Sequence, residues 1–68
     1  MIDTNALKGA IVANGLTQEK MAKIIGITPK TFYLKMKNGV FGSDEIQIMI
    51  DTLGIEDPAK IFFAEKVT

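Results

Sequence analysis

The sequence predicts an all-α fold built from five short helices. Hydrophobic residues recur three and four positions apart along most of the chain, which is the spacing of one helix face. No stretch alternates between apolar and polar residues for long enough to indicate a strand. With 68 residues, 47% of them hydrophobic, the chain is expected to form one domain, residues 1–68, around a single packed core.

Turn residues delimit the first two helices. An apolar stripe over residues 7–11 predicts a helix that ends near Asn14-Gly15. Thr17 is a preferred N-cap residue, so a second helix is expected to begin there. Gly26 is expected to end that helix, because glycine readily takes the left-handed conformation found at helix ends.

The third helix has the same kind of start. Thr28 is expected to cap it, and Pro29 takes the first helical position, where a missing N–H costs nothing. The helix is expected to end near Asn38-Gly39.

Two further helices are expected after a short loop. Ser43 is the expected N-cap of the fourth helix, whose apolar stripe runs over residues 46–53. Gly54 is expected to end it, and Asp57-Pro58 to open a short fifth helix through residues 61–63.

Composition excludes several classes of function. The chain has no Cys and no His, so it lacks the residues of a disulfide framework or zinc ribbon and the commonest general base. Its carboxylates fall at helix starts and on polar faces, where capping explains them. We therefore expect no enzymatic activity, no metal and no cofactor. No apolar run approaches the roughly 20 residues of a membrane span, so we expect a soluble, cytoplasmic protein with no membrane partner.

The net charge of zero conceals an uneven distribution. Residues 1–40 carry six lysines and two acids, whereas residues 41–68 carry two lysines and six acids. A basic half joined to an acidic half predicts an anionic partner for the first half. The alternative is a chance scatter of solvated surface charges.

The second and third expected helices carry a resemblance to a known family. The turn between them, around residues 26–27, is so short that the two helices must cross steeply, as in a helix-turn-helix. Residues 16–39, LTQEKMAKIIGITPKTFYLKMKNG, resemble the helix-turn-helix of the phage repressor and Cro family, the lambda-repressor-like or XRE family. The matching positions are Gln18, Ala22, Gly26, Phe32 and the Asn38-Gly39 exit, and the likeness continues to Leu53-Gly54-Ile55.

The resemblance implies both a fold and a function. It implies a compact five-helix, lambda-repressor-like DNA-binding domain of a phage or prophage transcriptional regulator, whose third helix reads the major groove. One position departs from the family pattern: Lys35 stands where an apolar residue is usual, and Met36 is expected to replace it in the core. With Phe32 and Met36 pointing inward, a helical wheel gives an outward face of Lys30, Thr31, Leu34, Lys37 and Asn38, with Tyr33 at its edge.

Specific contacts follow for this face. Lys30 can donate to a guanine edge, and Leu34 can contact a thymine methyl group or can simply be an exposed leucine. Tyr33, Lys35 and Lys37 can reach phosphates, the alternatives being a half-buried ring and solvated lysines. The residues expected to contact double-stranded DNA are Thr17, Gln18, Thr28, Lys30, Thr31, Tyr33, Leu34, Lys35, Lys37 and Asn38. Because the chain has no Arg, it is expected to make fewer bidentate base contacts than most DNA readers.

The C-terminal region predicts a homodimer on a pseudo-palindromic site. A short helix cannot bury three consecutive bulky residues on one face, so Ile61, Phe62 and Phe63, together with Ile48, are expected to form a dimer interface. The alternative is that the two phenylalanines fold back and complete the monomer core. A second functional reading is a protein-interaction module of the same fold, an antirepressor or a modulator of a repressor, with little DNA binding.

Overall fold

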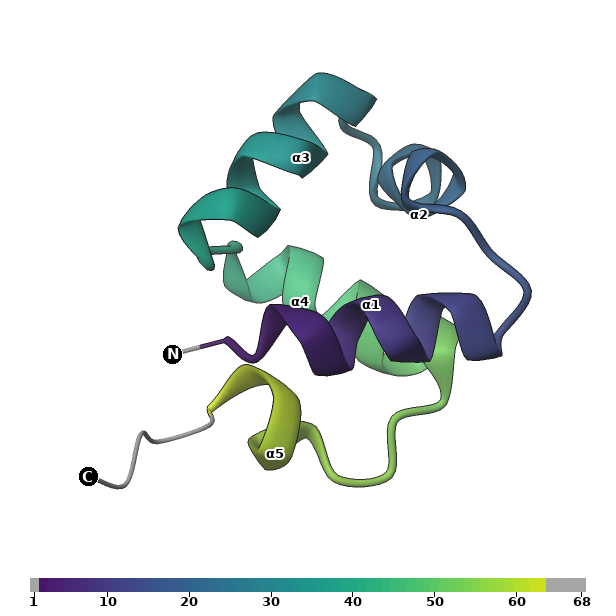
Figure 1. Ribbon diagram of the computed structural model, residues 1–68, viewed down its shortest axis with the longest axis vertical. Coiled ribbons are helices and arrows are strands. Elements are labelled where there is room, and N and C mark those ends of the chain that lie inside the picture. Colours follow the sequence, from purple (N-terminus) through teal and green to yellow (C-terminus); the bar gives the residue numbers. More distant parts are fainter. Residues whose placement is uncertain (1, 64–68) are drawn as a thin grey trace.

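The computed structural model describes residues 2–63, which fold into five α-helices with no strand among them. The all-α prediction is therefore confirmed. In Figure 1, α1 and α4 lie in the middle of the molecule, α2 and α3 form one end, and α5 lies at the other. The helices are α1 (Thr4–Ala13), α2 (Gln18–Ile25), α3 (Pro29–Asn38), α4 (Ser43–Leu53) and α5 (Pro58–Phe62).

The predicted ends of α2 and α3 are confirmed. The Thr17 hydroxyl accepts the Lys20 N–H at 3.1 Å, and the Thr28 hydroxyl accepts the Thr31 N–H at 3.2 Å. Gly26 ends α2 in the left-handed region, with φ of 93°, a conformation that side chains with a Cβ rarely adopt. This residue makes the tight turn into α3 possible.

The predicted start of α4 is wrong by one residue. Gly42, not Ser43, is the N-cap, and Ser43 already has helical geometry. The Glu45 carboxylate reaches back to accept the Gly42 N–H at 2.7 Å, so the side chain of the third helical residue satisfies the backbone N–H of the N-cap residue.

The buried residues form one cluster to which every helix contributes. Phe32 is fully buried and Met36 is 5% exposed, which confirms that these two residues are the inward face of α3. Ala22 is also fully buried, in α2, the helix that packs most extensively on α3. The cluster comprises Ile2, Leu7, Ile11, Met21, Ala22, Phe32, Met36, Phe41, Met49, Leu53 and Phe62.

The last helix folds back on the first. The Asp3 N–H donates to the Ile61 carbonyl at 2.7 Å, and Phe62 is only 2% exposed. Phe62 therefore belongs to the monomer core and offers almost no surface to a partner. For this residue the prediction of a dimer contact is wrong, and the alternative, that it folds back to complete the core, is confirmed. Ile48 and Ile61 are half-buried, and Phe63 is 65% exposed.

None of the helices within residues 2–63 is both long enough and apolar enough to cross a membrane.

We expect Ala22→Leu to lower the stability of the protein by about 1–3 kcal/mol, because a fully buried position has no room for three more carbon atoms. For a domain of this size such a loss lowers the melting temperature by several degrees, about 4–8 °C per kcal/mol. Thermal unfolding followed by circular dichroism measures it. Ala13→Leu, at an exposed position of α1, is the matched control. Equal melting temperatures for the two variants would contradict the close packing of α2 on α3.

Candidate nucleic-acid interface

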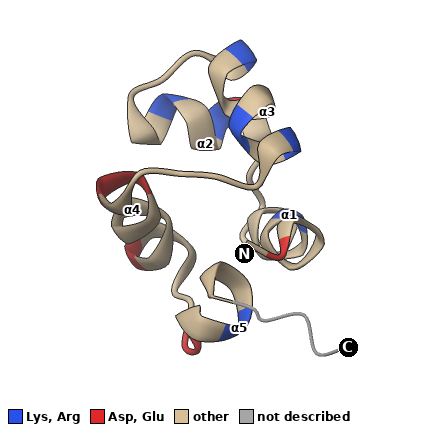
Figure 2. Ribbon diagram, turned by 90° about the vertical axis from the view of Figure 1, so that its left-hand side faces the viewer, with Lys and Arg blue, Asp and Glu red and all other residues tan. Residues whose placement is uncertain are grey.

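The lysines gather at one end of the molecule. Figure 2 shows most of them on α2 and α3, whereas the acidic residues lie mainly on α4 and in the turn before α5. The exposed lysines of this end are Lys20, Lys23, Lys30 and Lys37. The uneven charge of the sequence therefore becomes a basic end at α2 and α3, with most acidic residues on the remaining elements, and the basic end is the one that would attract an anion.

The outward face of α3 is well exposed. Leu34 is 58% exposed and Tyr33 is 45% exposed, and Lys30, Lys37 and Asn38 are also at the surface. Because Phe32 and Met36 hold the opposite face in the core, this combination of lysines, an apolar side chain and an amide is presented to solvent as one strip. Such a strip can meet both phosphates and base edges.

Polar side chains lie at the starts of both α2 and α3. Thr17 and Gln18 lie at the start of α2, where the first N–H groups have no partner within the helix. At the start of α3, the Thr28 hydroxyl donates to the Thr31 hydroxyl oxygen at 2.9 Å. The Thr31 hydroxyl proton is then left to donate outward. Both helix starts can therefore offer donors to an anion.

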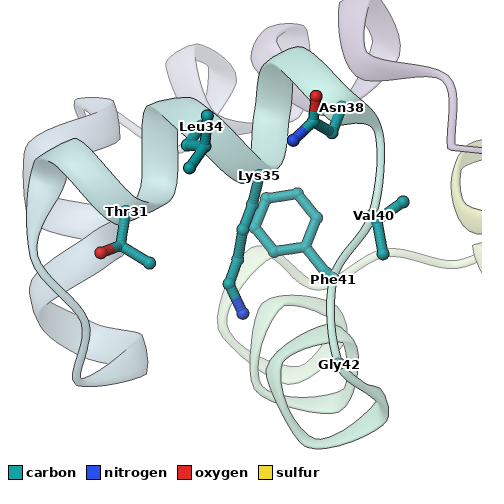
Figure 3. A pocket seen from close by; sticks show the side chains of 7 residues that line it. All are labelled: Thr31, Leu34, Lys35, Asn38, Val40, Phe41 and Gly42. Atoms are coloured by element: carbon teal, nitrogen blue, oxygen red, sulfur yellow. The ribbon is translucent and has the colours of Figure 1, made fainter.

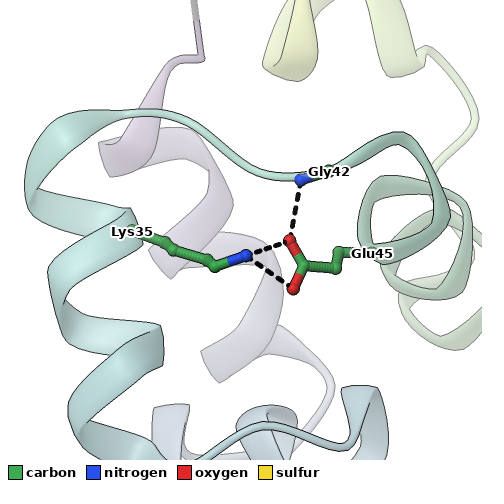
Figure 4. A network of polar contacts seen from close by, with 3 residues as sticks. All are labelled: Lys35, Gly42 and Glu45. Carbon is green, nitrogen blue, oxygen red and sulfur yellow. Dashed lines mark hydrogen bonds and ion pairs between the residues drawn. The ribbon is translucent and has the colours of Figure 1, made fainter.

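Lys35 differs from the other lysines of α3 because it is paired with an acid. Its Nζ lies 2.7 Å and 2.8 Å from the two carboxylate oxygens of Glu45, on α4. The same carboxylate accepts the Gly42 N–H, so one acidic side chain ties α3, the loop and the start of α4 together (Figure 4). The two side chains are 32% and 16% exposed, which makes the pair largely shielded from water.

The environment of Glu45 favours its charged form. Burial of the carboxyl group raises its pKa, but the hydrogen bonds from Lys35 and from the Gly42 N–H, together with the positive charge of Lys35, outweigh burial. The net result is a pKa below the ordinary value of 4.5. The ion pair is therefore complete at neutral pH.

A shallow depression of about 340 Å³ runs beside α3, between the helix and the loop that follows it. Figure 3 shows Leu34 and Val40 on the two sides of this depression, with Lys35 pointing away from Leu34 toward α4. It is lined by Thr31, Leu34, Lys35, Asn38, Val40, Phe41 and Gly42.

The structure brings together most of the residues that the sequence singled out. All ten predicted contact residues lie on or beside α2 and α3, at the basic end, although the ammonium of Lys35 is engaged by Glu45. Sequence reasoning missed Val40, Phe41 and Glu45. The sequence held one indication of this contact. Lys35 is a charged residue at a position where an apolar residue is usual, and such a residue needs an acidic partner nearby.

The predicted interface residues of the C-terminal region are not brought together as one exposed surface. Phe62 is in the core, Ile61 packs partly against it, and Phe63 alone among the four is strongly exposed.

Comparison of the chain with protein-family models, with curated proteins and with solved structures found no match. In residues 2–63, no three acidic side chains lie close enough together to hold a metal ion. The case for a nucleic-acid partner therefore depends on the charges and exposed side chains of α2 and α3.

We expect Glu45→Gln to lower the free energy of unfolding at neutral pH by about 1 kcal/mol, because a charge-assisted hydrogen bond is lost. Since folding lowers the pKa of Glu45, its carboxylate stabilises the folded state above pH 4.5, and this contribution is lost as the pH falls through the lowered pKa. The difference between wild type and variant should therefore shrink as the pH is lowered below 4.5.

Urea denaturation at successive pH values measures this difference. Asp51→Asn is the control, because Asp51 is exposed on the same helix and is hydrogen-bonded to the neighbouring Gln47 side chain. A difference for Glu45→Gln that stays constant with pH would contradict an ionised Lys35–Glu45 pair.

Proposed function

We propose that this protein is a cytoplasmic, sequence-specific DNA-binding regulator of transcription, of the phage Cro or repressor type. The observation that carries the proposal is the outward strip of α3, an exposed face with lysines at residues 30 and 37 and uncharged side chains between them, at the basic end of the molecule. A helix is the element that fits the major groove, and this strip combines groups for phosphates with groups for base edges.

The geometry of α2 and α3 supports the same proposal. The two helices are separated only by residues 26–28, they pack against each other, and Ala22 of α2 is fully buried. In a helix-turn-helix the first helix contacts the DNA backbone with its N-terminus while the second enters the groove. Thr17 and Gln18 would then meet a phosphate, and Thr28, Lys30 and Thr31 would lie at the leading end of the reading helix.

The side chains available for reading are unusual for their lack of arginine. Lys30 supplies the cation for a guanine edge, Asn38 supplies an amide, and Tyr33 and Lys37 flank them for phosphate contacts. The pairing of Lys35 with Glu45 directs its charge toward α4. Affinity for one half-site should therefore be modest and strongly dependent on salt.

We propose further that the protein binds as a homodimer to a pseudo-palindromic site. Two reading helices on one face of B-DNA lie about 34 Å apart. A body with extents of 34 × 23 × 19 Å can meet this spacing when two copies lie side by side. Phe63, 65% exposed directly after α5, is the apolar residue at the C-terminal end of the described chain that a partner copy would cover.

The alternative function is a protein-interaction module that reuses the same fold as an antirepressor or a modulator of a repressor. The zero net charge and the absence of arginine favour it. Retention on heparin or bulk DNA at low salt, lost as salt rises, supports the DNA-binding function, whereas no retention supports the alternative.

We expect Lys30→Ala to weaken binding to a selected operator duplex by about 1–3 kcal/mol and to relax the preference at one base pair. The duplex comes from selection of random DNA by the wild-type protein. Lys60→Ala is the matched control, because Lys60 is a highly exposed lysine on α5, at the opposite end of the molecule. Equal losses on selected and on random duplexes would show that Lys30 contacts a phosphate and reads no base.

We expect sedimentation to show a dimer at high micromolar concentration, and Phe63→Ser to shift it toward monomer without unfolding it, since Phe63 lies outside the core. Val12→Ser, at a 72% exposed position of α1, should leave the dimer intact. Phe62→Ser is unsuitable for this purpose because Phe62 is buried in the core. A wild type that stays monomeric and binds a palindrome without cooperativity would contradict the homodimer.

A further inference from the structure

A second shallow depression, of about 770 Å³, lies between α1, the turn after α4 and α5, and is called the α1 groove below. On α1 it is lined by Ala6, Ala10 and Ala13, which follow one another at a spacing of one helical turn. Ile55 of the turn and Ile61 of α5 supply larger apolar side chains. Because alanine side chains are short, another chain can approach α1 closely along this line.

Hydrogen bonds fix the α1 groove near both ends of the helix. At the start of α1, the Asp3 N–H donates to the Ile61 carbonyl at 2.7 Å. At its end, the Asn14 side-chain amide donates to the Ala10 carbonyl at 2.8 Å and to the Leu53 carbonyl at 3.2 Å. These bonds join α1 to α5 and to the end of α4. The groove therefore has its shape before a partner arrives, which lowers the entropic cost of binding.

The charges that line the α1 groove are mostly negative. They are the carboxylates of Asp3, Glu56 and Asp57 and the ammonium group of Lys60. Lys60 lies 4.0 Å from Asp57, but both side chains are well exposed, so this pair neutralises the rim only weakly. Within residues 2–63, Glu56 makes no ion pair. A negative rim repels the phosphates of nucleic acids and lipids and attracts a cationic partner.

We propose that the α1 groove is a docking site for a basic, amphipathic helix of a protein partner. The apolar face of that helix packs along the alanines of α1, and its lysines or arginines meet the carboxylates of Glu56 and Asp57. The inference goes beyond the proposed function and does not depend on it, because no residue of α2 or α3 lines the groove. A copy of the protein bound to DNA through α3 would keep this groove open to the partner.

The test uses the full chain and two synthetic helical peptides. One peptide has leucines along one face and lysines on either side of them, and the other has glutamate in place of each lysine. Backbone amide NMR signals of the protein follow each titration. We expect the lysine peptide to shift the signals of Ala10, Ala13 and Ile55, and to bind less tightly as salt rises. No binding, equal binding of both peptides, or shifts confined to residues outside the groove would overturn the proposal.

A second arm tests the acidic rim. The double variant Glu56→Gln/Asp57→Asn should bind the lysine peptide about fivefold more weakly, the effect of losing two exposed ion pairs. The Asp57 side chain makes no capping hydrogen bond to α5, so the change leaves the helix start intact. Asp44→Asn/Asp51→Asn is the matched control, because it changes the net charge equally at exposed positions of α4 outside the groove. Equal losses in the two double variants would overturn the assignment of the rim.

A third arm fills the groove. Ala13 lines it but is exposed, so Ala13→Leu should keep the protein folded while its larger side chain occupies space that the peptide needs. We expect affinity for the lysine peptide to fall about fivefold or more. Val12→Leu is the control, because Val12 is the neighbouring residue of α1, is 72% exposed and does not line the groove. Unchanged peptide affinity in Ala13→Leu would overturn the site.

A second copy of the chain is the competing occupant of the α1 groove. Sedimentation of the wild type and of Ala13→Leu, without peptide, separates the two cases. If Ala13→Leu converts a dimer into a monomer, the groove is an interface between copies and the assignment to another protein is overturned. An oligomeric state that Ala13→Leu leaves unchanged supports a groove that is free to receive a different protein.

Discussion

The burial of Phe32 is the constraint on which the rest of the structure depends. Its side chain is completely enclosed, and together with Met36 it sets the rotation of α3 about its own axis. That rotation decides which residues of α3 face solvent. It also anchors the loop after α3, because the Phe41 ring packs against Phe32. One aromatic side chain thus orients the candidate reading strip and fixes the segment that borders it.

Among the described residues, one partly shielded ion pair, Lys35–Glu45, connects the basic part of the chain to the acidic part. Lys35 comes from the basic half and Glu45 from the acidic half, and the pair joins α3 to the start of α4. Because desolvation offsets much of the attraction, the pair contributes only about 1 kcal/mol of stability. Its importance here is geometric, because the Glu45 carboxylate also holds the Gly42 N–H and so fixes the loop between the two helices. The pairing also changes the charge that α3 presents, leaving Lys30 and Lys37 as its exposed cations.

The C-terminal helix shows how a chain this short completes its core. A backbone hydrogen bond from Asp3 to Ile61 ties the start of α1 to α5, and Phe62 closes the end of the core opposite α2 and α3. The sequence predicted an exposed apolar patch at residues 61–63. Of these residues only Phe63 is strongly exposed. The monomer can therefore bury its own core. A dimer would not be needed for folding and would serve DNA binding instead.

The sequence by itself determined the number of helices, most of their ends and the inward residues of α3. These features depend on local physics: N-cap threonines at 17 and 28, left-handed glycines, and a helical spacing of apolar residues that one helix face must bury. The tertiary structure alone decided three others. Gly42, held by the Glu45 carboxylate, became the N-cap of α4 in place of Ser43. Lys35 formed an ion pair with Glu45 instead of standing free at the surface, and Phe62 is buried in the core while Phe63 is exposed. Each of these outcomes depends on which residues meet across different helices, and no local pattern of spacing or composition specifies such a meeting.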